Sequence, residues 1–241
     1  MKTLCWLLSG HPSIDDCKTI IDAYVKGGCE GIEWSIPFAN PYIGQEYRFK
    51  NESEAYKNCP DMEKHLELIA ATKIKYPNVD ITPGFYKETM LDIGTNNVIN
   101  FCIANNIDNI ITVGRYDQEI IDELNRSGIK NTVEVSYYLT EEELNAAKKG
   151  SGYIYMQALP YPAEIEAGYS TERLGECIKI LRNTGIDRPI YGFMNIREPE
   201  DIKIIKNAGA DGFILGSLLL EHYNNMEVLS EIINAFKEAG E

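Results

Sequence analysis

Short apolar runs alternate along the whole chain with longer segments in which apolar residues recur every three or four positions. A strand buried on both faces gives a short continuous apolar run, whereas a helix packed on one side gives a stripe. One such stripe contains Ile14, Cys17, Ile20, Ile21, Tyr24 and Val25. The strand-like runs cover residues 3–9, 31–38, 79–85, 109–113, 132–137, 152–158, 189–194 and 212–218. The pattern therefore predicts eight strands separated by helical segments.

Polar residues and glycines mark the ends of the helical segments. Ser13 precedes Asp15 and Asp16, and Thr140 precedes Glu143 by three positions, which is the arrangement that caps a helix N-terminus. Glycine tolerates the left-handed conformation that commonly ends a helix. Glycines in such places are Gly28, Gly128, Gly150, Gly185 and Gly209. These signals predict helices that begin and end between the strand-like runs.

The 241 residues divide into eight units of about 30 residues, the size of one strand–helix repeat. Such an alternation implies a parallel sheet, which is either open or closed. A doubly wound open sheet is the alternative, but no G-x-G-x-x-G follows the first strand. Eight equal units favour closure, because a closed sheet has no exposed edge. With no linker along the chain, we expect one (β/α)8 (TIM) barrel domain over residues 1–241.

The charge balance limits the partners of the chain. A formal net charge of −14 repels nucleic acid and anionic membranes over most of the surface. No apolar run reaches the roughly 18 residues that a membrane helix requires. The apolar stretch over residues 1–8 is too short for a signal peptide. We therefore expect a cytoplasmic protein that acts on a small molecule.

The cysteines and histidines do not form a metal-binding pattern. The chain has six cysteines and three histidines. No pair of cysteines forms a C-x-x-C, and no histidine stands at metal-ligand spacing from a cysteine. Reduced structural thiols are the expected state in a cytoplasmic protein, and no metal site is expected.

The functional residues of a barrel lie at the carboxyl ends of its strands. Glu33 lies inside the apolar run at 31–38, where an unpaired carboxylate would be costly. Pointing into the barrel mouth, it would have a raised pKa, which suits a general acid or base. The alternative is a structural ion pair with a neighbour such as Arg115.

Gly216 and Ser217 end the last strand-like run and open a helical turn. Free backbone N–H groups at such a turn bind phosphate whatever the net charge of the protein, and the loop after the eighth strand is a common phosphate site. The alternative is a tight strand-to-helix turn without a ligand.

Several of these runs together resemble the α subunit of tryptophan synthase. The resemblance rests on Leu8-Ser9-Gly10-His11-Pro12, on Gly27-Gly28-Cys29-Glu30-Gly31-Ile32-Glu33 and on Ile36-Pro37-Phe38-Ala39-Asn40-Pro41. Later runs follow in the family's order: Gly192-Phe193, Pro199-Glu200-Asp201, Ala208-Gly209-Ala210-Asp211-Gly212 and Leu215-Gly216-Ser217. The resemblance implies a (β/α)8 barrel that cleaves indole-3-glycerol phosphate into indole and glyceraldehyde 3-phosphate by a retro-aldol reaction.

The resemblance also implies roles for individual residues. Glu33 matches the glutamate that moves the proton between the glycerol hydroxyl and indole C3, and Tyr155 matches the tyrosine on strand six. The expected substrate-binding residues are Trp6, Gly192, Phe193, Gly216 and Ser217. The family uses no metal or organic cofactor of its own. Its partner is a pyridoxal-phosphate β chain that consumes the indole.

The chain also departs from the family pattern. The family has an aspartate after strand two that accepts the indole N–H, and Gly44 stands at that place here. Glu46, two residues further on, is the candidate replacement. Residues 159–162 replace a basic, glycine-rich loop after strand six, and Met194-Asn195 follow Gly192-Phe193 where the family has a second glycine. Only two residues precede the first strand, so we expect the barrel to lack the family's N-terminal floor helix.

Three functions therefore remain open. The chain cleaves indole-3-glycerol phosphate with the help of Glu46, or it performs a related aldol cleavage or proton transfer on another substrate, phosphorylated or unphosphorylated. The third reading is a non-catalytic partner of a synthase β chain. Loss of one hydrogen-bonding carboxylate from a transition state costs on the order of 2–4 kcal/mol, which weakens the first reading without removing it.

Overall fold

Eight parallel strands close into a barrel in the order of the chain. The computed structural model describes residues 1–42, 46–114 and 118–241. The strands are β1 (Lys2–Leu8), β2 (Gly31–Ser35), β3 (Asp80–Tyr86), β4 (Asn109–Val113), β5 (Lys130–Val135), β6 (Ile154–Gln157), β7 (Ile190–Phe193) and β8 (Gly212–Leu215). Pairing of β1 with β8 closes the sheet, with Lys2 opposite Gly212. The predicted (β/α)8 barrel is confirmed.

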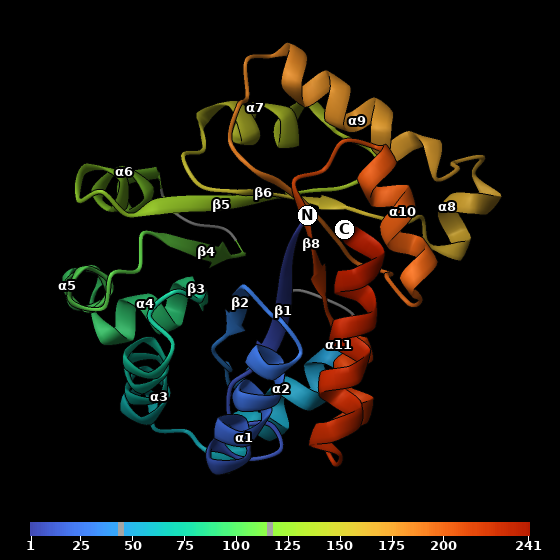
Figure 1. The fold of residues 1–241 in the computed structure, drawn as a ribbon. Coiled ribbons are helices and arrows are strands. Elements are labelled where there is room, and N and C mark those ends of the chain that lie inside the picture. Colours follow the sequence, from blue (N-terminus) through green and yellow to red (C-terminus); the bar gives the residue numbers. More distant parts are fainter. Residues whose placement is uncertain (43–45, 115–117) are drawn as a thin grey trace.

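Helices surround the strands on the outside of the barrel (Figure 1). They are α1 (Ile14–Lys26), α2 (Glu46–Asn58), α3 (Met62–Lys75), α4 (Lys87–Ile93), α5 (Thr95–Ala104), α6 (Gln118–Arg126), α7 (Glu141–Lys149), α8 (Pro162–Glu166), α9 (Glu172–Asn183), α10 (Pro199–Asn207) and α11 (Met226–Gly240). A 3₁₀ helix, η1 (Ser217–His222), follows β8. The two termini lie side by side, and the N-terminal amine of Met1 donates to the Gly240 carbonyl at 3.4 Å.

Two strands end three residues earlier than their apolar runs. The run at 31–38 continues past the end of β2 at Ser35. The strand ends there because Pro37 has no N–H to donate to a ladder. The run at 212–218 divides at Gly216 into β8 and η1. Helix α2 gives no apolar stripe, since most of its residues are polar, and the sequence pattern did not predict it. At the start of the chain, β1 begins at Lys2.

The predicted helix caps are mostly present. The Ser13 side chain accepts a hydrogen bond from the N–H of Asp16, and Thr140 forms a capping box with Glu143. Gly28, Gly128, Gly185 and Gly209 all have positive φ angles. Gly150 is the exception, since its φ of −63° lies outside the left-handed region. Most of these helix ends could therefore be predicted from the sequence.

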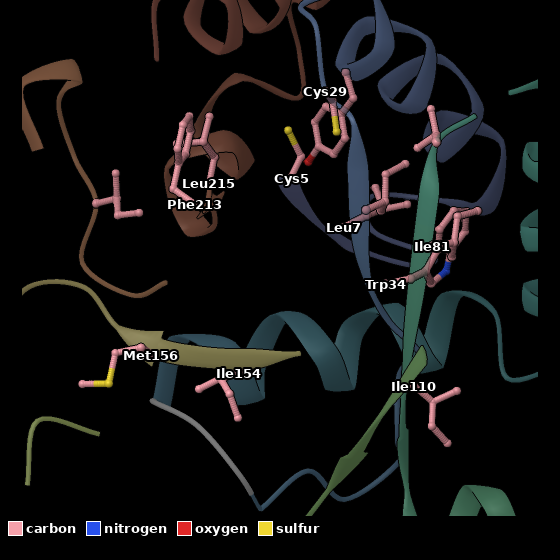
Figure 2. Close-up of a cluster of buried hydrophobic side chains, with 14 of the residues drawn as sticks. Cys5, Leu7, Cys29, Trp34, Ile81, Ile110, Ile154, Met156, Phe213 and Leu215 are labelled. Atoms are coloured by element: carbon pink, nitrogen blue, oxygen red, sulfur yellow. The ribbon is translucent and has the colours of Figure 1, made fainter. Parts of the chain in front are cut away.

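Alternate strand residues build two apolar layers. Side chains that point away from the barrel axis pack under the helices, and Figure 2 shows ten of them labelled, including Trp34, Ile154 and Phe213. Side chains that point inward form a second cluster, of which Trp6, Tyr155 and Phe193 are members. Among the described residues, no helix is long and apolar enough to cross a membrane. The inner layer carries the polar groups that concern the site.

We expect Gly152→Ala to lower the free energy of unfolding by about 1–3 kcal/mol. A Cβ at Gly152 would lie 2.6 Å from the backbone carbon of Asn131 and 2.6 Å from the nitrogen of Thr132, and backbone cannot move aside cheaply. Gly175→Ala in α9 is the matched control. Its Cβ would meet nothing closer than 3.8 Å, so this variant should be as stable as the parent or up to about 1 kcal/mol more stable. Urea unfolding measures both, and equal midpoints for the two variants would contradict the close approach of β5 and β6.

Candidate active site

A cavity of about 120 Å³ opens at the carboxyl ends of β1, β2, β7 and β8. Trp6 and Glu33 form part of its wall, and Arg48 enters from α2. The opposite wall comes from the segment after β7 and from Gly216 and Ser217 after β8. Residues far apart in the chain therefore meet at the end of the barrel where (β/α)8 proteins place their reactive groups.

Glu33 points into this cavity from the middle of β2. In the ladders it stands opposite Trp6 on β1 and Thr82 on β3, and only 6% of its surface is exposed. The pKa of Glu33 is raised to about 8, mainly by burial and in part by the nearby Glu134 carboxylate, while Arg48 opposes the shift. The group therefore holds its proton at neutral pH and can release it near that pH.

Arg48 lies beside Glu33 and is held by two neighbours. Its guanidinium carbon is 5.5 Å from the centroid of the Trp6 ring, and its Nη2 donates to Ser35 Oγ at 3.3 Å. Trp6 Nε1 donates to the same Ser35 oxygen at 2.7 Å. Ser35 thus fixes the guanidinium over the face of the Trp6 ring.

A second buried carboxyl group, Glu52, lies one helical turn after Arg48. Arg48 Nε is 3.9 Å from Glu52 Oε2, and the Tyr86 hydroxyl donates to that oxygen at 3.3 Å. Burial raises the pKa of Glu52 to about 7, although Arg48 and the Tyr86 hydrogen bond lower it. The Tyr86 ring stacks on Phe38 with centroids 5.0 Å apart. These contacts close the back of the site behind Arg48.

A larger cavity of about 650 Å³ adjoins the site on its β4–β5 side. Arg48 lines both cavities, and Glu134 lines only the larger one. The register pairs Glu134 with Tyr155 on β6, so both side chains leave the same side of the sheet. Because the Glu134 side chain is exposed to solvent, water partly screens its charge. Arg48 therefore stands at the junction of the two spaces.

The wall opposite Glu33 comes from the end of β7, from the segment after it and from the turn after β8. Phe193 at the end of β7 and Met194 and Asn195 after it line this wall, and Met194 and Asn195 have positive φ angles of 68° and 60°. The Asn195 amide donates to the Pro160 carbonyl at 2.8 Å, which ties this segment to the loop after β6. A Cβ at Gly216 would meet nothing within 4 Å, so the backbone there is open to the cavity.

Gly192 and Tyr155 lie near the cavity but do not line it. A Cβ at Gly192 would come within 2.9 Å of Ile205, so this glycine permits close packing of β7 against α10. Tyr155 is fully buried deeper in the barrel. Burial and the Glu33 carboxylate both raise its pKa. Thr82 is close enough to lower that pKa in part, yet the Tyr155 hydroxyl forms no regular hydrogen bond to any described residue.

Five of the eight predicted site residues meet around one cavity: Trp6, Glu33, Phe193, Gly216 and Ser217. The side chain of Glu46, which begins α2, lies outside the described part of the structure, as do Gly44 and Arg115. The proposed roles of all eight residues stay predictions. Within the described residues, no group of three or more His, Cys, Asp or Glu side chains is arranged to hold a metal.

Sequence reasoning missed Arg48, Glu52 and Glu134. Glu134 carried the same signal as Glu33, namely a carboxylate inside the apolar run at 132–137. Arg48 and Glu52 stand four positions apart, a spacing that pairs charges on a helix, but α2 itself was not predicted. Nothing in their local sequence indicates that this pair faces the barrel mouth.

A closed parallel barrel with a protonatable carboxyl group in its mouth has the architecture of the (β/α)8 barrel enzymes. The family model of the tryptophan synthase alpha chain matches residues 2–239. The chain therefore belongs to the tryptophan synthase alpha chain family, which is a family of lyases.

Curated relatives agree with this assignment, and solved structures share the fold. The alpha chain of Photorhabdus laumondii is 25% identical over 243 residues, which cover 95% of this chain and 90% of that protein. The alpha chain of Buchnera aphidicola subsp. Melaphis rhois is 24% identical over 63% of this chain, but the match spans only 57% of its own length. The alpha subunit structure from Legionella pneumophila superposes with a TM-score of 0.84 at 16% identity, covering 99% of this chain and 92% of that one. The tryptophan synthase complex from Pyrococcus furiosus gives 0.83 at 17% identity, covering 98% of each chain.

We expect Glu33→Gln to change how stability depends on pH. The unfolded carboxyl group has a pKa near 4.5 and the folded group a pKa of about 8, so between these values the folded state binds one more proton than the unfolded state. That extra proton makes the parent lose stability as pH rises from about 4.5 to 8, at up to about 1.4 kcal/mol per pH unit. Glutamine does not titrate, so the free energy of unfolding of the variant should rise relative to that of the parent as pH increases across this window. Urea unfolding between pH 5 and 9 measures the difference, and parallel curves would show that Glu33 is not a buried, protonated acid.

Proposed function

We propose that this chain is a carbon–carbon lyase of the aldol type in which Glu33 is the general acid and base. The observation that carries the proposal is a buried carboxyl group, with its pKa raised to about 8, that lines a cavity at the carboxyl ends of the strands. A group that titrates near neutral pH both gives and accepts a proton within one turnover. Membership in a lyase family supports the same reaction class.

Indole-3-glycerol phosphate is the first substrate to test, because the family resemblance implies it. Protonated Glu33 would give its proton to indole C3, which leaves the positive charge on the indole ring. The resulting carboxylate would then take the proton of the adjacent glycerol hydroxyl. The bond between indole C3 and the carbon that bears this hydroxyl then breaks. Its electron pair returns to the indole ring, and the hydroxyl carbon becomes the carbonyl of glyceraldehyde 3-phosphate.

The phosphate group would bind at the far wall of the same cavity. Gly216 and Ser217 are the proposed partners, because the backbone there is open and lines the cavity opposite Glu33. Phe193 and Trp6 would contact the body of the substrate. Tyr155, buried below the cavity, is proposed as a catalytic residue on the resemblance alone, and Glu46 is proposed as the replacement for the family's aspartate.

We expect Glu33→Gln to lower indole release by a factor of about 10²–10⁴, the usual contribution of a general acid or base. Glu52→Gln is the matched control, since it also removes a buried carboxyl group of raised pKa next to Arg48 but one that does not line the cavity. The control should retain activity within about tenfold of the parent. Indole appearing at the parental rate from the Glu33 variant would disprove the assignment.

The rate of the reaction should fall at alkaline pH. Because the first step uses protonated Glu33, kcat/KM should be flat below the folded pKa and decrease as pH rises through about 8. A profile that rises through pH 8 instead would mean that the carboxylate starts the reaction. Assays of indole release from pH 5.5 to 9.5 distinguish these outcomes.

A second candidate is the same chemistry on another substrate. Arg48 is the specific observation in its favour, because a cation beside Glu33 opposes the positive charge that develops on an indole ring. The altered segment after β6 also lines the cavity, through Tyr161. Parent protein that releases no indole, yet exchanges a substrate proton in a Glu33-dependent way, would favour this candidate.

We further propose a tryptophan synthase β chain as the partner. Support comes from the likeness of the fold to the chain in the Pyrococcus furiosus complex. Indole release should be measured with and without a β chain, together with co-elution from a sizing column. Co-elution without indole release under either condition would favour the non-catalytic partner function, and separate elution would contradict the partnership.

A further inference from the structure

Arg48 has hydrogen-bonding capacity that the protein leaves unused. A guanidinium carries five N–H donors and no acceptor. Among the described residues, its one hydrogen bond is the long contact of Nη2 with Ser35. Its Nε is buried without a hydrogen-bond partner in the same part of the chain, since Glu52 is at ion-pair distance only. Nη1, in contrast, is not buried and forms no hydrogen bond to a described residue, so its N–H groups are free to bind a ligand.

The guanidinium is also held in place and open to both cavities. The Trp6 ring and Ser35 fix its position, which lowers the entropy lost when a ligand binds. It lines the small cavity with Glu33 and the large cavity with Glu134, so a molecule in either space can reach it. The side chain retains 21% exposure, enough for contact with a solute.

The donor-only chemistry of Arg48 decides which substrate group fits beside Glu33. An indole N–H needs an acceptor, and a guanidinium cannot supply one. Two parallel N–H groups of a guanidinium match the two oxygens of a carboxylate, which accepts both hydrogen bonds. The polar neighbour of Glu33 in this chain therefore suits an anionic oxygen ligand and not an N–H donor.

We propose that Arg48 is a specificity-determining residue that binds a carboxylate group of the substrate next to Glu33. This inference rests on the second candidate of the proposed function, with the acid–base chemistry of Glu33 kept and the substrate changed. The substrate class is a small molecule with a carboxylate near the carbon that receives the proton. A phosphate on the same molecule would bind at the opposite wall, at Gly216 and Ser217.

Binding of two nearly isosteric probes tests the inference without requiring turnover. Indole-3-carboxylate and indole-3-carboxamide have almost the same shape and differ in charge. Isothermal titration calorimetry on the full chain should show the carboxylate binding about 10- to 100-fold more tightly, the range expected for charge-assisted hydrogen bonds. Arg48→Met should remove this preference, and Arg48→Lys should restore part of it. Thermal unfolding of each variant verifies that it is folded.

Further variants and probes distinguish a wrong role for Arg48 from a wrong role for Glu33. Glu33→Gln should keep the preference for the carboxylate, because binding does not use proton transfer. Because the preference is read from binding alone, failure of the Glu33 assignment in the assays of the proposed function would leave the role of Arg48 standing. Equal affinities of the parent for the two probes, or a preference that survives in Arg48→Met, would overturn the role of Arg48. Inorganic phosphate that binds more tightly than the carboxylate in an Arg48-dependent way would assign Arg48 to a phosphate subsite and overturn the carboxylate assignment.

Discussion

Closure of the eight-stranded sheet forces every second strand side chain into a confined interior. The inner cluster fills most of that space with Trp6, Tyr155 and Phe193, which are large enough to close it. Near the carboxyl ends of the strands the filling is incomplete, and Glu33 reaches the remaining space. The position of the site therefore follows from closure, because only a closed sheet brings the ends of β7 and β8 to the same cavity as β2.

Enclosure then determines the electrostatics of the mouth. Two carboxyl groups, Glu33 and Glu52, are buried next to one guanidinium, and burial penalises the charged form of each. Arg48 opposes the shift but does not cancel it, so both acids titrate near neutral pH. The same enclosure that makes Glu33 a competent acid also leaves Arg48 with donors that find no acceptor among the described residues.

Helix α2 supplies the cation that lies beside Glu33. It follows β2 in the chain, packs at the mouth and directs Arg48 onto the Trp6 ring. Glu52, one turn later, anchors the helix through Tyr86 and the Phe38 stack. The family resemblance implies a carboxylate after β2 that accepts a hydrogen bond from the substrate. Arg48 can only donate, so it suits a substrate group that accepts hydrogen bonds. On the proposed role of Arg48, specificity in this chain would depend on helix α2 more than on the strands of the barrel.

The sequence alone determined the eight strands, most helix ends and five of the residues around the cavity. It could do so because periodicity, caps and carboxylates within apolar runs are local signals, and because functional groups lie at the carboxyl ends of barrel strands. It did not determine the partners of Glu33. Arg48 lies on a polar helix with no apolar stripe, and Glu134 is 101 positions from Glu33 in the chain. Only closure of the barrel brings these charges together. A contact between two residues that are far apart in the chain cannot be predicted from the sequence next to either one.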